Sequence, residues 1–194
     1  AQKAARLSQG HIGRAKWLAT NPDAVTRRLD AVRLALGLRD VGGAMEGAAT
    51  LVAWATEQAQ AQAVGRDELE EAQLSAALGV GGTGRGAPRG SAKALKELEK
   101  EQKSRTTRAT RDCLDMALLD IATAYRDIIT LQLNSESELI NEDLRSEISA
   151  LAQSTKPASM LKRWEAVMVT RRTLNFNVAP LLAIEALLLH VKFK

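Results

Sequence analysis

Four residues near the start of the chain have the types and spacing that suit contact with a phosphate group. They lie where an amphipathic helical pattern begins, and they are Ser8, Gly10, Gly13 and Arg14. Glycine allows positive φ and close approach of another backbone, while a helix start offers free N–H groups at the positive end of its dipole. The same pattern also suits a helix that seats tightly against another domain. Because the motif begins so close to residue 1, we expect the chain to be part of a larger protein.

A second group of candidate residues is basic. Residues 85–111 include nine Lys or Arg and three Glu, a balance of +6 that exceeds the whole-chain charge of +4. Several of these cations recur at three- and four-residue spacing, which places them on one helix face. The candidate contacts to DNA or phosphate are Lys93, Lys96, Lys100, Lys103, Arg105 and Arg108. A solvated helix face is the alternative, and the lack of interleaved aromatic residues excludes base stacking.

A third group lies between the last two expected helices and comprises Arg171, Arg172, Asn175 and Asn177. Two arginines at a helix C-terminus oppose the helix dipole, and a following asparagine caps the next helix. The dipole explains the position but not two adjacent arginines. The alternative is that these residues meet a neighbouring subunit, and both interpretations stay open.

No set of residues suited to catalysis or metal binding emerges. His11 and His190 are far apart in the sequence, and Cys113 has no partner at ligand spacing. The adjacent Asp112 raises the expected pKa of the thiol, which makes it a poor nucleophile. Residues 84–91 lack the Gly-Lys-Ser/Thr of a phosphate loop and follow no strand. We expect no enzyme activity, no metal and no cofactor.

The composition favours an all-α protein of the cytoplasm. Of 194 residues, 45% are hydrophobic but only 3% are aromatic, so a core must be built from Ala, Leu, Ile and Val. A single cysteine excludes an internal disulfide and fits a reducing compartment. We expect no secretory signal and no membrane span, because the most apolar stretch, residues 179–191, is short and includes Glu185.

Apolar spacing and capping residues predict helices joined by short turns, packed as a bundle. The expected helices span residues 4–19, 21–37, 44–64, 67–78, 91–133, 137–153, 157–174 and 177–191. A break is expected at residues 41–43, and the Gly-rich stretch 79–90 is expected to be a flexible linker. In the long helix, the polar first half is expected to face solvent and the second half to pack. Leu181, Ile184 and Leu188 are expected to be buried.

Two segments together resemble the clamp-loader family of AAA+ proteins. Residues 7–15, Leu-Ser-Gln-Gly-His-Ile-Gly-Arg-Ala, resemble the start of the sensor-2 helix in the lid domain. Residues 171–191, with Asn175-x-Asn177 followed by Leu-Leu-Ala-Ile-Glu-Ala-Leu-Leu-Leu, resemble the last helices of the collar domain in bacterial DNA polymerase III delta-prime subunits. The Gly-rich linker followed by a basic helix is similar to the actinobacterial form.

This resemblance implies a collar-like helical bundle preceded by the remnant of a helical lid. Residues 1–20 would be the end of the lid and residues 21–194 the collar, with the linker at 79–90 and a basic helix at 91–111. Collars of five subunits, delta and tau/gamma among them, form a ring that holds the clamp loader together. The loader places the sliding clamp on primed DNA, so contact of this chain with DNA is expected to be indirect or weak.

The resemblance also implies roles for individual residues. Arg14 corresponds to the sensor-2 arginine, which makes it, with Ser8, Gly10 and Gly13, a candidate for nucleotide sensing. The group from Arg171 to Asn177 becomes a candidate subunit interface, and an apolar or mixed lateral surface is expected. The alternative function is a stand-alone helical nucleic-acid-binding protein that uses residues 85–111.

Overall fold

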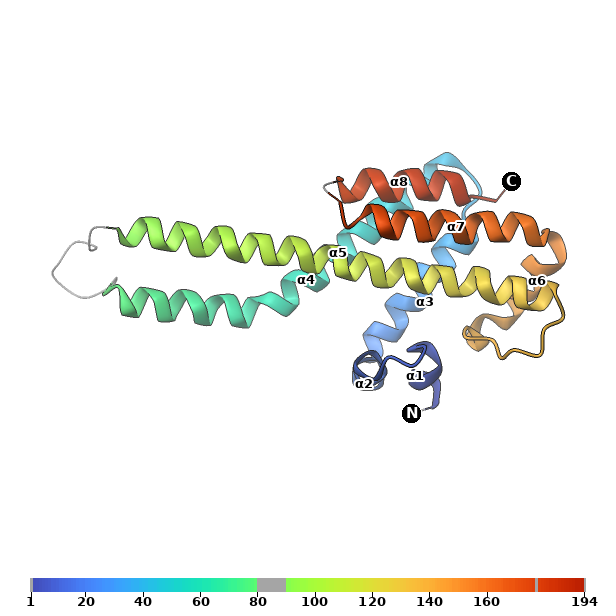
Figure 1. The fold of residues 1–194 in the computed structure, drawn as a ribbon, viewed down its shortest axis with the longest axis horizontal. Coiled ribbons are helices and arrows are strands. Elements are labelled where there is room, and N and C mark those ends of the chain that lie inside the picture. Colours follow the sequence, from blue (N-terminus) through green and yellow to red (C-terminus); the bar gives the residue numbers. More distant parts are fainter. Residues whose placement is uncertain (1, 80–89, 177, 194) are drawn as a thin grey trace. The chain divides into compact units, whose positions relative to one another are not determined.

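The computed structural model describes residues 2–79, 90–176 and 178–193, so most of the expected linker lies outside the described residues. Every regular element among the described residues is a helix, which confirms the predicted all-α class (Figure 1). In chain order the helices are α1 (Gln2–Leu7), α2 (Ile12–Thr20), α3 (Pro22–Gly37), α4 (Val41–Ala77), α5 (Ser91–Gln132), the 3-10 turn η1 (Glu142–Leu144), α6 (Arg145–Ser154), α7 (Pro157–Thr173) and α8 (Pro180–Val191).

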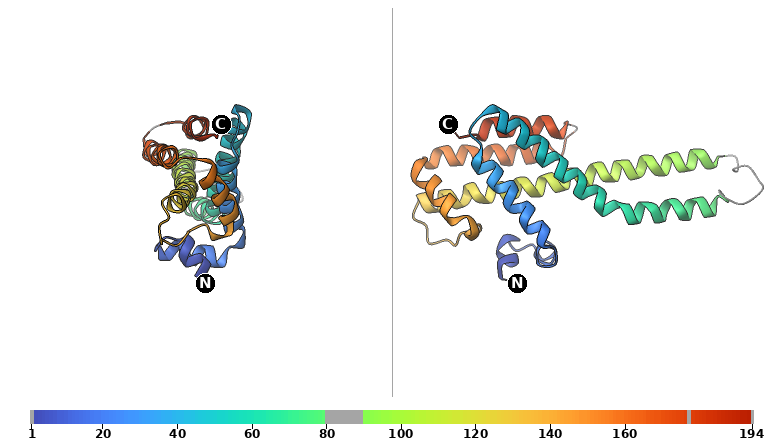
Figure 2. Two further views of the ribbon diagram at one scale, coloured as in Figure 1. Left: turned by 90° about the vertical axis from the view of Figure 1, so that its right-hand side faces the viewer. Right: turned by 180° about the vertical axis from the view of Figure 1, so that it is seen from behind.

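The chain divides into two compact units, and each is described by itself. The first unit comprises Ala1–Leu51 and Asp115–Lys194, and the second comprises Val52–Leu114. In the first unit, α7 and α8 pack on each other as an antiparallel pair (Figures 1 and 2). The apolar stripe predicted on the second half of α5 is buried, with exposed fractions of 0–1% at Leu114, Leu118, Ile121, Tyr125 and Ile128.

The second unit is a helical hairpin. The later part of α4 and the early part of α5 run antiparallel, side by side in each view (Figures 1 and 2). Ala55, Ala59 and Ala63 are buried at four-residue spacing, and such small side chains let a neighbouring helix approach closely. Gln102 Nε2 donates to the carbonyl of Asp67 at 3.0 Å. The sequence had predicted that the first half of α5 faces solvent. That prediction is only partly right, because one side of this half packs on α4.

The N-terminal segment forms two helices instead of the one expected over residues 4–19. α1 ends at Leu7 and α2 begins at Ile12. Between them the backbone turns at Gln9 and Gly10, whose φ angles are +52° and +86°. Positive φ is readily adopted by glycine but interrupts a right-handed helix.

α4 is one continuous helix, whereas the sequence predicted a break followed by two helices. Gly42 and Gly43 fall in its first turn, where the leading N–H groups have no intrahelical partner in any case. Asp40 caps this end, because its Oδ1 accepts a hydrogen bond from the N–H of Gly43 at 2.8 Å. Gly65 lies inside the helix, where glycine costs about 1 kcal/mol relative to alanine.

The helix expected over residues 137–153 begins later, at η1 and α6. Side chains of α5 hold the preceding backbone in a non-helical path. Arg126 Nη1 donates to the carbonyl of Glu138 at 2.7 Å, and Asp127 Oδ2 accepts from the N–H of Asn141 at 2.7 Å. Because these backbone groups find partners on α5, they do not need the hydrogen bonds of a helix.

The C-terminal helices follow the prediction with one correction. α7 has nearly the expected bounds, and α8 begins at Pro180, while its expected first residue, Asn177, lies outside the described residues. Ile184 and Leu188 are fully buried as predicted, but Leu181 is 39% exposed, so that prediction is wrong. Leu181 lies in the first turn of α8.

Phe193, which follows α8, packs against the connection between α3 and α4 within the first unit. Its N–H donates to the carbonyl of Leu38 at 2.9 Å. The guanidinium carbons of Arg39 and Arg163 lie over its ring, 5.2 and 4.4 Å from the centroid. The ring is buried, so two cation–π contacts act in addition to its hydrophobic burial.

Candidate functional site

The N-terminal motif forms the turn between α1 and α2. His11 caps α2, since its Nδ1 accepts a hydrogen bond from the N–H of Arg14 at 3.2 Å. Ser8 is buried, and its hydroxyl donates to a carbonyl of α1 at 2.7 Å. Gly10 takes the positive φ, and Gly13 is exposed in the first turn of α2. The structure thus brings the four predicted residues together, and their backbone and hydroxyl groups shape the turn.

The side chain of Arg14 is buried in the first unit. Its Nη2 forms an ion pair with Asp120 of α5, and Nε of Arg28, from α3, contacts the same carboxylate oxygen at 2.9 Å. The three side chains are only 2–6% exposed. One carboxylate on α5 therefore holds arginines from two other helices, and the nucleotide-sensing role of Arg14 stays a prediction.

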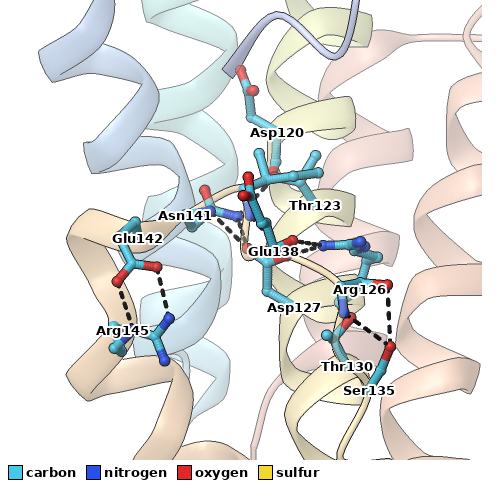
Figure 3. Close-up of polar contacts among 12 residues, drawn as sticks. Asp120, Thr123, Arg126, Asp127, Thr130, Ser135, Glu138, Asn141, Glu142 and Arg145 are labelled. Carbon is cyan, nitrogen blue, oxygen red and sulfur yellow. Dashed lines mark hydrogen bonds and ion pairs between the residues drawn. The ribbon is translucent and has the colours of Figure 1, made fainter. Parts of the chain in front are cut away.

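These polar contacts continue along α5 to the segment before η1 (Figure 3). Arg28 Nη2 donates to Asn141 Oδ1 at 2.6 Å and to Thr123 Oγ1 at 3.3 Å. Asn141 Nδ2 donates in turn to Thr123 Oγ1 at 3.0 Å and to Asp127 Oδ2 at 2.8 Å. We call this set the buried network: Arg14, Arg28, Asp120, Thr123, Asp127 and Asn141.

Burial affects ionisation within the network. It raises the pKa of the Asp120 carboxyl, and the neighbouring Arg28 and Arg14 act against that shift. Burial likewise lowers the pKa of the Arg28 guanidinium. By contrast, Glu142 forms an exposed ion pair with Arg145 (Figure 3), and the hydrogen bonds that Arg145 donates lower the pKa of the Glu142 carboxyl. The network joins α2, α3 and the segment before η1 to α5, and loss of one partner would leave a charge buried without compensation.

The two arginines at the end of α7 have different surroundings. Arg171 makes a two-point ion pair with Asp115 of α5, with Nε–Oδ1 and Nη2–Oδ2 distances of 2.8 and 2.7 Å. Arg172 and Asn175 are exposed, and Asn177 lies outside the described residues. Arg171 therefore has an internal partner, and Arg172 and Asn175 are accessible to another molecule.

The predicted basic contacts also separate into two groups. Arg105 faces α4, where it forms ion pairs with Glu70 and Asp67. Arg108 is exposed. The other four predicted contacts are exposed on the same helix, and they are Lys93, Lys96, Lys100 and Lys103.

Cys113 is a poor nucleophile, because burial and the adjacent Asp112 raise the pKa of its thiol. Within the described ranges, no three His, Cys, Asp or Glu side chains come together in a way that could hold a metal ion. Nor does any helix in that part of the chain have the length and apolarity needed to cross a membrane.

Exposed apolar side chains occur on α7, on α8 and in the turn between them. Leu161 and Val169, 48% and 51% exposed, lie on one side of α7. Phe176 in the turn is 69% exposed, and Leu182 in the first turn of α8 is 63% exposed. We call Leu161, Val169, Phe176, Leu181 and Leu182 the α7–α8 surface. Phe176, Leu181 and Leu182 lie at or next to the turn between the two helices, whereas Leu161 lies near the start of α7. Exposed apolar side chains that form a contiguous patch mark interaction sites.

The sequence holds a signal for only one of the interior charged members of the buried network. Arg28 lies at four-residue spacing from Ala24 and Val32, on the buried side of α3. A charged residue on an apolar stripe must find a buried partner, and that rule identifies Arg28. Asp120 and Asp127 lie two turns apart on α5, about 100° around the helix from its apolar stripe, so the rule identifies neither of them.

Comparison with known proteins relates the C-terminal part of the chain to one family. A search of curated proteins and a search of solved structures each gave no match. The segment that does match a family model contains the acidic side of the buried network and the whole α7–α8 surface. Residues 109–192 match the model of the family described as DNA polymerase III, delta subunit, C terminal, which is a clamp-loader family.

Proposed function

We propose that this chain is the collar region of a clamp-loader subunit of the delta-prime type, and that it acts by assembly without catalysing a reaction. The observation that carries this proposal is the match of residues 109–192 to the C-terminal domain of a DNA polymerase III subunit. The matched family is that of the delta subunit. The finer delta-prime and actinobacterial assignments rest on the sequence resemblance of residues 171–191 and of the linker with its basic helix.

Helix packing between subunits is the proposed mechanism. The α7–α8 surface would be covered by a neighbouring collar, in an interface of about 1,600 Å². Phe176 is its most exposed member, and aromatic side chains that become fully desolvated contribute most to such interfaces. Arg172 and Asn175 lie beside it as polar contacts. The proposed partners are the delta and tau/gamma subunits of a hetero-pentamer in the cytoplasm, with residues 1–20 as the lid end and 21–194 as the collar.

Capture of purified loader subunits by the tagged chain tests this proposal. We expect the native chain to retain tau/gamma and delta, and the double variant F176S/L182S to retain them at least about tenfold more weakly, since two apolar anchors are lost. The matched control is V64S/L69S, which replaces two exposed apolar residues of α4 and should behave as the native chain does. Failure of the native chain to retain either subunit, or equal losses in both variants, would contradict the proposal.

An omission experiment tests the delta-prime assignment separately. The chain is added to a loader mixture that lacks delta-prime and to one that lacks delta. We expect a complete complex only in the first mixture. Completion of the second mixture alone would assign the chain to the delta type and leave the collar proposal standing.

A further inference from the structure

Four lysines form a row on the exposed face of the hairpin. They recur at three- and four-residue spacing, line one shallow surface hollow with Glu97 and Glu99, and are all exposed. We call this row the basic ridge: Lys93, Lys96, Lys100 and Lys103. Arg105, which faces α4, is neutralised by ion pairs with Asp67 and Glu70. No ion pair involves a ridge lysine among the residues that the structure describes.

Helix energetics neither select nor exclude the basic ridge. Lys93 and Lys96 lie in the first two turns of α5, at the positive end of its dipole, and no acidic residue occupies the first turn. Lys96 and Lys100 are like charges four residues apart, a spacing that destabilises a helix, whereas Lys93–Glu97 and Glu99–Lys103 are opposite charges at the same spacing, which stabilises one. The exposure and the spacing of the four lysines are therefore the features that point to a ligand.

The length and charge of the ridge fit the backbone of a nucleic-acid duplex. From Lys93 to Lys103 the helix rises about 15 Å, at about 1.5 Å per residue. Counting both strands, B-DNA carries a phosphate about every 1.7 Å along its axis, which gives about nine phosphates over that length. The four cations of the ridge can therefore each meet a phosphate of the duplex.

We propose that the basic ridge binds the phosphate backbone of double-stranded DNA without reading its sequence. No aromatic residue occurs from residue 91 to residue 114, so stacking on unpaired bases is not available. The ridge precedes the segment that matches the clamp-loader family, residues 109–192. It is thus a separate site and does not rest on the proposed function.

Fluorescence anisotropy with a labelled duplex of mixed sequence, measured over a salt series, tests this site. With four phosphate contacts, the native chain should lose about 100-fold in affinity between about 50 and 200 mM salt. The variant K96Q/K100Q/K103Q should bind more weakly at low salt and lose only about threefold to fourfold over the same range. Glutamine suits a helix about as well as lysine does, and far-UV circular dichroism checks that the hairpin is intact.

Two further variants make the test specific. K16Q/K156Q/K162Q removes the same amount of charge at exposed lysines of the first unit and should keep the native salt dependence. E97Q removes a carboxylate beside the ridge and should raise affinity about twofold at low salt. The proposal is overturned by any of three results: no duplex binding at low salt, equal losses in the two triple variants, or tighter binding of single-stranded than of duplex DNA.

Discussion

At Asp120, a single carboxylate compensates two arginines that come from separate helices. The side chains of Arg14 and Arg28 are almost fully buried, and an isolated buried guanidinium would lose several kcal/mol of hydration free energy. Their shared pairing with Asp120 offsets that loss and fixes α2 and α3 on α5. Asp120 therefore contributes to the stability of the first unit, because without it two buried guanidinium groups would have no counter-charge.

Replacement of Asp120 by Asn should destabilise the protein strongly. It leaves two buried cations without a counter-charge, and the free energy of unfolding should fall by about 3–5 kcal/mol. Urea denaturation followed by circular dichroism measures the change. The control E142Q disrupts the exposed pair with Arg145 and should have little effect, as exposed pairs are screened by solvent. A loss below about 1 kcal/mol in D120N would show that the arginines are compensated in another way.

Alkylation of Cys113 should report its raised pKa. Because the thiolate is the reactive form, the rate with iodoacetamide should reach half of its maximum at a pH above 9.0, the ordinary pKa of the group. A free cysteine peptide in the same buffer is the reference and should reach half of its maximum at a lower pH. A midpoint for Cys113 at or below that of the peptide would mean that burial and Asp112 do not hold the thiol protonated.

At the scale of elements, Phe193 should contribute strongly to the stability of the first unit, although it lies beyond the end of α8. The ring is buried and carries two arginine contacts, so Phe193→Ala should lower the free energy of unfolding by about 3–5 kcal/mol. Phe176→Ala removes the same side chain at an exposed site and should change stability by less than about 0.5 kcal/mol. Similar losses in both variants, measured by urea denaturation, would contradict the assigned role of Phe193.

The sequence allowed the helices to be predicted wherever local signals and packing agree. The apolar stripe of α5 and the Pro-initiated α3 and α7 are examples. Local signals failed where a tertiary contact decides the backbone. Asp127 and Arg126 hold the segment before η1 out of a helix, and the spacing of residues along the chain does not reveal that these side chains will be within reach. The start of α4 is different, because Asp40 is a local cap three residues before Gly43, a signal that the prediction of a break overlooked.

The candidate residues show the same division. Spacing alone placed the ridge lysines correctly on one exposed face, since helix geometry fixes that outcome. It did not distinguish Arg105 and Arg171, which pair with α4 and α5, from Arg108 and Arg172, which remain exposed. Which arginines are internally paired depends on the neighbouring helix, and only the folded structure shows it.

At the scale of the whole molecule, the two units have separate proposed tasks. Assembly would use the α7–α8 surface of the first unit, and duplex binding would use the basic ridge of the second. The variant F176S/L182S should therefore keep the native salt dependence of DNA binding, and K96Q/K100Q/K103Q should keep native capture of loader subunits. These sites share no residue, so their effects should be independent. Loss of both properties in either variant would contradict this division.

Native mass spectrometry of a reconstituted loader tests the proposal of assembly most directly. The chain is mixed with purified delta and tau/gamma subunits, with no other source of delta-prime. We expect a five-subunit complex that contains one copy of this chain, and we expect the complex to be absent with F176S/L182S. A chain that remains free while the other subunits associate among themselves would contradict the proposal that helix packing on the α7–α8 surface is its function.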